Sequence, residues 1–305
     1  MSNRLLAAGT NLIDVNFRGV PGYVGAIVLD TGMGLVLVDP GPESTIRALN
    51  KGLELLAADL HDVTAILVTH IHLDHAGSVG SILAVNPEIT VYVHRSGAHH
   101  LTNPTRLLAS AARLYGERME ELWGKIEPVP ETRLVALEGG ERLSWGSRKI
   151  RVEYTPGHAK HHVSYLDETS GLCFVGDTAG VVLSGGRIVL PVTPPADIDL
   201  VKWRETTNAI RKLRPARLVH THFGLSDDPV AHLARHLGML EEWADRVKAS
   251  LVDTNSDQVR AREFAARIAA EIGGDDQGVA ALELALSGLT DSWLGLAQYW
   301  RRASG

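Results

Sequence analysis

The sequence of 305 residues contains a single cysteine and no long apolar run. Cys173 has no second cysteine with which to form an internal disulfide bond, which agrees with a reducing compartment. A membrane-spanning helix needs about 18 consecutive apolar residues, and no run approaches that length. Residues 1–17 also lack a basic start followed by an unbroken apolar core, so no secretory signal is expected. We therefore expect a cytoplasmic protein that does not associate with membranes.

Charged residues form no block of like sign, and no basic stripe with interleaved aromatic residues is present. The formal net charge of −6 and the pI near 6.2 give no general attraction to a phosphate backbone. Nucleic acid is therefore not an expected partner, and a small-molecule substrate is expected instead. With 45% hydrophobic residues and no repeat of fixed period, the chain can bury a large core.

Three histidines and one aspartate lie within the six residues 70–75. An apolar run at residues 65–68 predicts a buried strand just before them, and a helix is expected from about Asp74 to Val85. His70 and His72 are two residues apart in extended chain, so their rings project to the same side. Asp74 and His75 would then fall in the first turn of the helix. Imidazole and carboxylate groups are ligands for Zn²⁺, Fe²⁺ and Mn²⁺, so this segment predicts a metal site.

The spacing His70-x-His72-x-Asp74-His75 resembles the signature of the metallo-β-lactamase superfamily. Further motifs follow in the order that this family uses: Val36-Leu37-Val38-Asp39-Pro40-Gly41-Pro42, Thr155-Pro156-Gly157-His158, Val175-Gly176-Asp177 and His220-Thr221-His222-Phe223-Gly224. The resemblance extends over residues 10–225 or so. It implies an α/β fold, the αββα sandwich, in which helices flank two mixed β-sheets.

The resemblance also implies the ligands of two divalent metal ions. His70, His72 and His158 would hold one ion, Asp74, His75 and His222 the second, and Asp177 would bridge them. Zinc is expected first, with iron or manganese as alternatives. In this family a metal-bridging hydroxide attacks a carbonyl carbon, so Asp74 and Asp177 are the expected catalytic residues, Asp74 as a ligand that also moves a proton.

The residue at position 177 separates branches of the superfamily. True β-lactamases of this fold usually have cysteine or serine there, whereas thioesterase-like and lactonase-like members have aspartate, as this chain does. The leading prediction is therefore a hydrolase of carbonyl esters, thioesters or lactones. The alternatives are a persulfide dioxygenase-like oxidoreductase with a single iron, a β-lactamase-like amide hydrolase, and a metal-binding protein without catalytic activity.

Several other residues have open roles. His220 and His222 have the same parity on one strand, so either could be the last ligand, although the resemblance favours His222. Asp39 is expected to orient a ligand without touching metal. Tyr115 is a candidate for the tyrosine that homoserine-lactone hydrolases place near their metals.

Two further groups of histidines lie near the motifs. His161 and His162 follow His158, and each could contact the substrate, support a ligand or form an ordinary loop hydrogen bond. His94, His99 and His100 follow an expected strand and could line the cleft, although exposed or helix-capping positions are favoured for them.

The rest of the chain predicts a catalytic domain at residues 1–225 and a helical extension at residues 226–305. In the first part we expect a hairpin at 26–38, a helix at 44–58, a helical insertion at 104–123 and a loop at 185–200. In the second part Asp228-Pro229 begins a helix that reaches about residue 252, another ends at Gly273-Gly274, and two more cover 279–286 and 291–300. The extension could cover the core, close the substrate pocket or form a homodimer contact.

Overall fold

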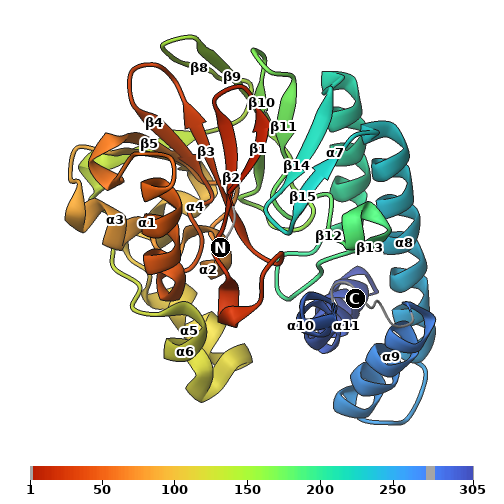
Figure 1. Cartoon of the computed structure of the whole chain (residues 1–305). Coiled ribbons are helices and arrows are strands. Elements are labelled where there is room, and N and C mark those ends of the chain that lie inside the picture. Colours follow the sequence, from red (N-terminus) through yellow and green to blue (C-terminus); the bar gives the residue numbers. More distant parts are fainter. Residues whose placement is uncertain (1–2, 273–278, 305) are drawn as a thin grey trace.

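The computed structural model describes residues 3–272 and 279–304, which form two β-sheets packed face to face with helices outside (Figure 1). The first sheet has seven strands in chain order, and the second has six in the order β15-β14-β11-β10-β9-β8. The first contains β1 Asn3–Ala7, β2 Thr10–Asp14, β3 Gly25–Asp30, β4 Leu35–Val38, β5 Val63–Leu67, β6 Thr90–His94 and β7 Leu134–Leu137. The second contains β8 Arg142–Trp145, β9 Arg148–Tyr154, β10 Val163–Asp167, β11 Leu172–Phe174, β14 Arg217–His220 and β15 Gly224–Ser226. Both sheets are mixed, as the sequence predicted, since each combines parallel and antiparallel neighbours.

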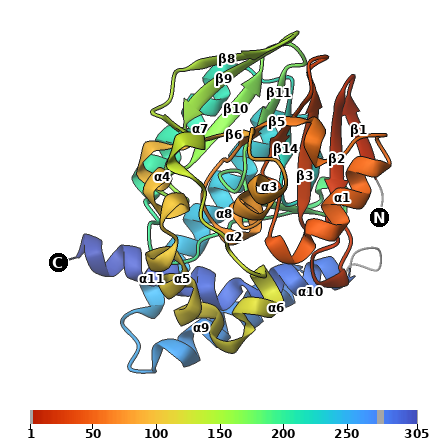
Figure 2. The same ribbon diagram turned by 90° about the vertical axis from the view of Figure 1, so that its left-hand side faces the viewer.

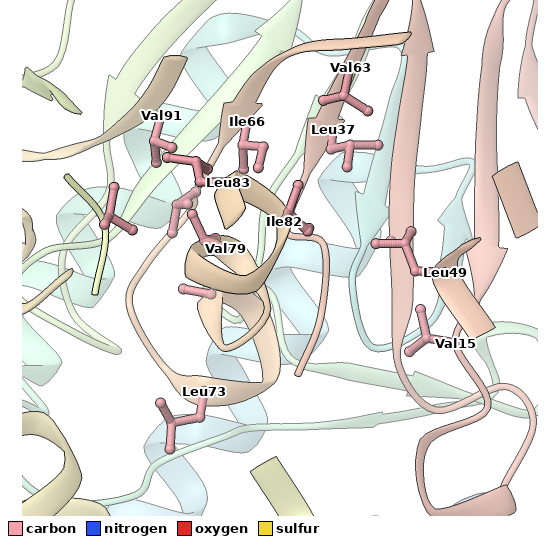
Figure 3. Close-up of a cluster of buried hydrophobic side chains, with 14 of the residues drawn as sticks. Val15, Leu37, Leu49, Val63, Ile66, Leu73, Val79, Ile82, Leu83 and Val91 are labelled. Carbon is pink, nitrogen blue, oxygen red and sulfur yellow. The ribbon is translucent and has the colours of Figure 1, made fainter. Parts of the chain in front are cut away.

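Alternation along β5 explains why this strand lies in the middle of the fold. Ile66 points into a hydrophobic cluster beneath the outer helices, whereas Leu67 points into the cluster between the two sheets. Both side chains are fully buried. The strand pairs in parallel with β4 and β6, and parallel strands need apolar side chains on both faces. Figure 3 shows the outer cluster, with Ile66 next to Val79 and Leu83 of the neighbouring helix.

The helices on the outer faces include α1 Ile46–Glu54, α2 Leu73–Ala76, α3 Val79–Val85, α4 Arg95–Thr102 and α7 Leu200–Leu213. The prediction of one continuous helix from Asp74 to Val85 was wrong. The chain forms α2 and α3 instead, because the backbone N–H and hydroxyl groups of Ser78 both donate to the carbonyl oxygen of Gly41 (3.0 and 2.9 Å). This contact with a distant turn replaces the bond that would continue the helix.

The two predicted insertions differ in structure. The first is helical as expected and consists of α5 Thr105–Tyr115, the 3₁₀ turn η4 Gly116–Arg118 and α6 Met119–Trp123. The second was predicted as a loop, but it contains β13 Ile188–Leu190, which pairs with β12 Val181–Leu183 in a separate two-stranded sheet. Short strands of three residues give too little alternation to be recognised in a sequence.

The C-terminal helices are α8 Pro229–Ser250, α9 Asp257–Ile272, α10 Val279–Ser287 and α11 Leu289–Ala303. As predicted, the Asp228 side chain caps α8 by accepting a hydrogen bond from Ala231 N (3.0 Å). The predicted stop at Gly273-Gly274 lies outside the described residues. Trp243 and Trp293 of these helices share one hydrophobic cluster with Trp203 of α7. Within residues 3–272 and 279–304, no helix combines the length and apolar character needed to cross a membrane.

Candidate metal centre

The loops that follow four strands bring the seven predicted ligands to one edge of the fold. His70 and His72 follow β5, Asp74 and His75 lie on α2, His158 follows β9, Asp177 follows β11, and His222 follows β14. Two groups of possible ligand atoms result, with the atoms of each group within 4.8 Å of one another. The first group is His70, His72, His158 and Asp177, and the second is Asp74, His75 and His222. This division matches the two ligand sets that the resemblance implied.

Asp177 joins the two groups through its two carboxylate oxygens. Oδ2 faces the first group, 3.4 Å from His158 Nε2 and 3.9 Å from His70 Nε2. Oδ1 faces the second group, 3.0 Å from His75 Nε2 and 3.5 Å from His222 Nε2. A carboxylate in this position can offset the repulsion between two neighbouring dications.

Hydrogen bonds on the outer side of the site fix the tautomers of four histidines. These bonds join His70 Nδ1 to Thr69 Oγ1 (3.1 Å), His75 Nδ1 to Asp39 Oδ2 (2.8 Å), His158 Nδ1 to Val192 O (2.8 Å) and His222 Nδ1 to Tyr23 O (2.9 Å). The carbonyl and carboxylate oxygens can only accept, and the Thr69 hydroxyl already donates to Asp39 (2.7 Å). Each Nδ1 therefore carries the proton, and each Nε2 turns a lone pair toward the centre of the site.

Unpaired polar atoms in the middle of the site fit bound cations. His72 Nδ1 lies 2.9 Å from His70 Nε2 and 3.0 Å from His158 Nε2. His75 Nε2 and Asp177 Oδ1 are buried 3.0 Å from each other, and neither has a hydrogen-bond partner outside the site. Such a convergence of lone pairs in a buried site is costly unless a proton or a metal ion lies between them. The donor set of imidazole and carboxylate groups suits zinc, iron or manganese.

The two groups differ in how readily they hold protons. Burial and neighbouring imidazoles lower the pKa of His70 well below its usual value, and burial beside His158 lowers the pKa of His72 to about 3. Burial is the largest influence and disfavours charge on His75 and His222, but the neighbouring carboxylates, Asp177 first among them and Asp74 also, together outweigh it and raise the pKa of both. Protons therefore compete with metal for the second group much more than for the first.

Asp39 supports the site from behind without joining either group, as the sequence predicted. Its carboxylate accepts hydrogen bonds from Thr69 N (2.8 Å), Thr69 Oγ1 (2.7 Å), Thr221 Oγ1 (3.0 Å) and His75 Nδ1. The residue lies in the left-handed region with φ of 49°, a conformation that aspartate tolerates better than most residues. These bonds connect the His70 loop, α2 and the His222 loop through one buried carboxylate.

His162 supports the bridging residue. Its Nε2 accepts a hydrogen bond from Asp177 N (3.3 Å), so Nδ1 carries the proton and donates to Thr155 Oγ1 (2.9 Å). His161, in contrast, lines the cavity beside the ligands, with Nδ1 3.5 Å from Ile71 N. The two adjacent histidines therefore have different surroundings.

His220 points away from the metal groups, so among the two candidates the structure brings His222 to the other ligands. His220 Nε2 lies 3.0 Å from Ser226 Oγ, which lies 2.9 Å from His232 Nδ1. His232 Nε2 donates to Ala179 O (2.8 Å), in the loop that carries Asp177. Because that carbonyl can only accept, His232 Nδ1 accepts from the Ser226 hydroxyl, which in turn accepts from His220. The sequence analysis missed Ser226 and His232, since no motif spacing marks them.

The predicted His94, His99 and His100 lie at the end of β6 and on α4, which follows it. His94 caps α4 through Ser96 N and stacks on Tyr154 with ring centroids 4.4 Å apart. His100 lines the cavity, whereas His99 is exposed and stacks on His100.

Comparison with known proteins identifies the family. The sequence profile of the metallo-beta-lactamase superfamily matches residues 19–222, which is more than half of the chain. The chain belongs to the metallo-beta-lactamase superfamily. The predicted family and its sandwich fold are therefore confirmed.

The similar proteins in this superfamily establish the fold of the chain but not its activity. A metallo-beta-lactamase fold-containing protein of Sulfurisphaera tokodaii is 32% identical over 62% of this chain and 69% of its own length. A hydroxyacylglutathione hydrolase of Aeromonas hydrophila is 30% identical over 47% of this chain, but the alignment spans only 41% of that enzyme. Among solved structures, an archaeal superfamily protein from Sulfolobus tokodaii aligns over 94% of this chain and 98% of its own, with a TM-score of 0.70 and 25% identity. A Thermus thermophilus family protein aligns over 98% of this chain and 95% of its own, with a TM-score of 0.74 and 20% identity, which shows the fold alone.

A cavity of about 590 Å³ opens beside both groups of candidate metal ligands. His72, Asp74 and Asp177 line the cavity where it meets these groups. Tyr23 and the predicted Tyr115 also line it, and burial together with the nearby Asp74 carboxylate raises the pKa of both phenols. Both phenols therefore stay protonated at neutral pH. The sequence analysis missed Tyr23 because no motif includes it.

Proposed function

We propose that the chain is a metal-dependent hydrolase of carbonyl esters, thioesters or lactones that binds two divalent ions, zinc first and iron or manganese as alternatives. The observation that carries this proposal is the position of Asp177, whose Oδ1 and Oδ2 face different ligand groups. Two metal ions bound there would lower the pKa of a water molecule toward neutrality and polarise a carbonyl oxygen. The named activity of the Aeromonas relative, a hydroxyacylglutathione hydrolase, supports a hydrolase of this class.

The residues of the chain have distinct parts in this proposal. Four histidines present Nε2 lone pairs because their Nδ1 protons are held on the outer side. Asp74 lies at the cavity, and its Oδ2 is 3.3 Å from His222 Nε2. Burial favours the neutral carboxyl form, but His75 and His222 outweigh it and lower the pKa of Asp74 to about 2. Because Oδ2 faces the second group, Oδ1 of the ionised Asp74 can accept a proton from the attacking water and pass it to the leaving group.

The oxidoreductase alternative would need a single iron site. The second group of Asp74, His75 and His222 is complete in the structure, which favours two ions over one. The amide-hydrolase alternative draws support from the likeness to solved metallo-beta-lactamases. One of these is 20% identical with a TM-score of 0.58, and this likeness concerns the fold alone.

Metal counting combined with a substrate panel tests this proposal. We expect inductively coupled plasma mass spectrometry to find close to two ions per chain, and the loaded protein to hydrolyse a 4-nitrophenyl ester, a thioester or a lactone. Matched persulfide and β-lactam substrates serve as the comparison. One iron per chain together with oxygen consumption on glutathione persulfide would overturn the hydrolase proposal, as would β-lactam hydrolysis without ester hydrolysis.

A further inference from the structure

The wall of the cavity that lies away from the metal ligands is built by two segments outside the sheets. One is the first insertion, whose helices α5 and α6 contribute Leu107, Leu114 and Leu122. The other is the C-terminal extension, where α10 contributes Leu284. Leu284 packs against the hydrophobic cluster that also contains Leu122, and both side chains line the cavity. Figure 2 shows that α5, α6, α10 and α11 all lie below the sheets.

Aromatic rings extend from this wall to the second group of candidate metal ligands. Phe17 stacks on Trp123 with centroids 5.6 Å apart, and Tyr115 meets Trp123 edge-on at 5.1 Å. Phe17 also stacks near Tyr23 at 6.4 Å, and Tyr23 lies 5.3 Å from His222. All four aromatic side chains line the cavity. An apolar surface therefore begins at a metal ligand and continues outward over the insertion.

Charged side chains also line the cavity near this wall. Arg18 and Arg118 line the cavity, and both lie 3.7 Å from carboxylate oxygens of Glu121. Asp291 of α11 also lines the cavity, and burial raises its pKa. Arg106 of α5 lines the cavity as well, so it is the apolar and aromatic side chains of the wall that favour an uncharged group.

We propose that this wall, from Tyr23 to Leu284, binds an apolar acyl group of the substrate, either an aliphatic chain of medium length or an aryl group. The proposal rests on the hydrolase function proposed above and specifies which acyl esters that site takes. An acyl group on the wall places its carbonyl carbon where the cavity meets Asp74 and Asp177. The leaving alcohol or thiol then lies on the side away from the wall.

A homologous series of 4-nitrophenyl esters measures this preference on the metal-loaded full chain. Each buried methylene group gives up to about fourfold in binding, so kcat/KM should rise from acetate through butyrate and hexanoate to octanoate. Phenylacetate should exceed acetate as well. Values of kcat/KM that stay level or fall along the series would overturn the acyl site.

A bulky side chain in the wall should remove the preference. In Leu284→Trp the indole occupies space of several methylene groups, so the octanoate-to-acetate ratio of kcat/KM should fall by roughly tenfold. Leu286→Trp is the matched control. Leu286 lies on the same helix, but it packs against the hydrophobic cluster that contains Trp243 and Trp293 and does not line the cavity. Leu114→Trp repeats the test from α5 if the first variant folds poorly. An unchanged ratio in both wall variants would contradict the proposal.

Binding of the product separates this inference from the hydrolase function. Calorimetry on the metal-loaded chain should find octanoate bound severalfold more tightly than acetate, and Leu284→Trp should remove the difference. If octanoate binds more tightly but no ester is hydrolysed, the acyl site stands and the hydrolase proposal falls. If esters are hydrolysed without a preference for chain length and the two acids bind equally, the acyl site falls and the hydrolase proposal stands.

Discussion

His232 Nε2 donates a hydrogen bond of 2.8 Å to the carbonyl oxygen of Ala179, two residues beyond Asp177. His232 belongs to the first turn of α8, so the C-terminal extension holds the loop of the bridging carboxylate. Ser226 and His220 continue the same chain of hydrogen bonds into β15 and β14.

We expect His232→Ala to weaken metal binding as well as the fold. The change leaves the buried Ala179 carbonyl without its His232 donor and the Ser226 hydroxyl without its His232 acceptor, which costs about 1–3 kcal/mol in the free energy of unfolding. A looser Asp177 loop should also raise the Kd for zinc, measured by competition with a chelator. His232→Gln offers an amide donor and should recover part of the affinity. Equal zinc affinity in all three proteins would show that the bond serves stability alone.

Asp177→Asn should lower metal occupancy below two ions per chain. The amide keeps the shape of the side chain, but it removes the negative charge that faces His75, His158 and His222. The metal content found by elemental analysis and the rate of ester hydrolysis should both decline. Asp197→Asn is the control, since Asp197 lines the cavity, pairs with Lys160 at 3.6 Å and belongs to neither group. If Asp177→Asn retains two ions, the bridging role is wrong.

Zinc affinity should increase as pH rises from about 6 to about 8, by up to tenfold per pH unit for each displaced proton. The cause is the second group, where Asp177 raises the pKa of His75 and His222 despite their burial. His72, with a pKa of about 3, is neutral in this range and adds no dependence. Competition titrations at several pH values measure this slope, and a flat profile would contradict the assignment.

The metal-free chain should become less stable as pH rises from about 6.5, the usual pKa of histidine in an unfolded chain. A folded pKa raised above that value adds stability that is fully present below the unfolded pKa and is lost as pH rises through the folded pKa. The protonated forms of His75 and His222 therefore stabilise the metal-free fold at the acidic side. Thermal melts with and without zinc check this, and only the metal-free melts should show the decline.

Chelation should lower the Tm of the purified protein at neutral pH. A ligand that binds only the folded state stabilises it by about 4 kcal/mol at a thousandfold excess over its Kd. Zinc added back should restore both the Tm and the hydrolysis. Asp177→Asn should respond less to the same treatment, and a wild-type Tm that ignores chelation would argue against a metal site.

Much of the candidate site and part of the fold could be predicted from the local sequence. His70, His72, Asp74 and His75 follow a buried strand, and a strand end fixes where such residues lie. The cap at Asp228 is equally local, because the side chain and its Ala231 N–H partner are three residues apart. These features depend on contacts that the spacing itself contains.

Features that depend on distant contacts could not be predicted in this way. The break between α2 and α3 comes from Ser78 bonding to Gly41, 37 residues earlier. Tyr23 reaches His222 across 199 residues through its carbonyl group, and the single sequence gives no signal for that contact. His220 and His222 have the same parity, but β14 ends at His220, so the alternation of a strand no longer applies to the second residue.

Leu284 reaches the cavity from a helix beyond residues 19–222, the part of the chain that the superfamily profile covers. The ligands and the outer part of the acyl wall therefore lie on separable stretches of the polypeptide. A chimera could exchange α10 and α11 for the equivalent helices of a relative while keeping α8 and its contact with Ala179. The seven candidate ligands would stay in place, and the cavity would change only where α10 and α11 line it. Divergence of the tail offers this protein a route to new acyl specificities without any change at the seven ligand positions.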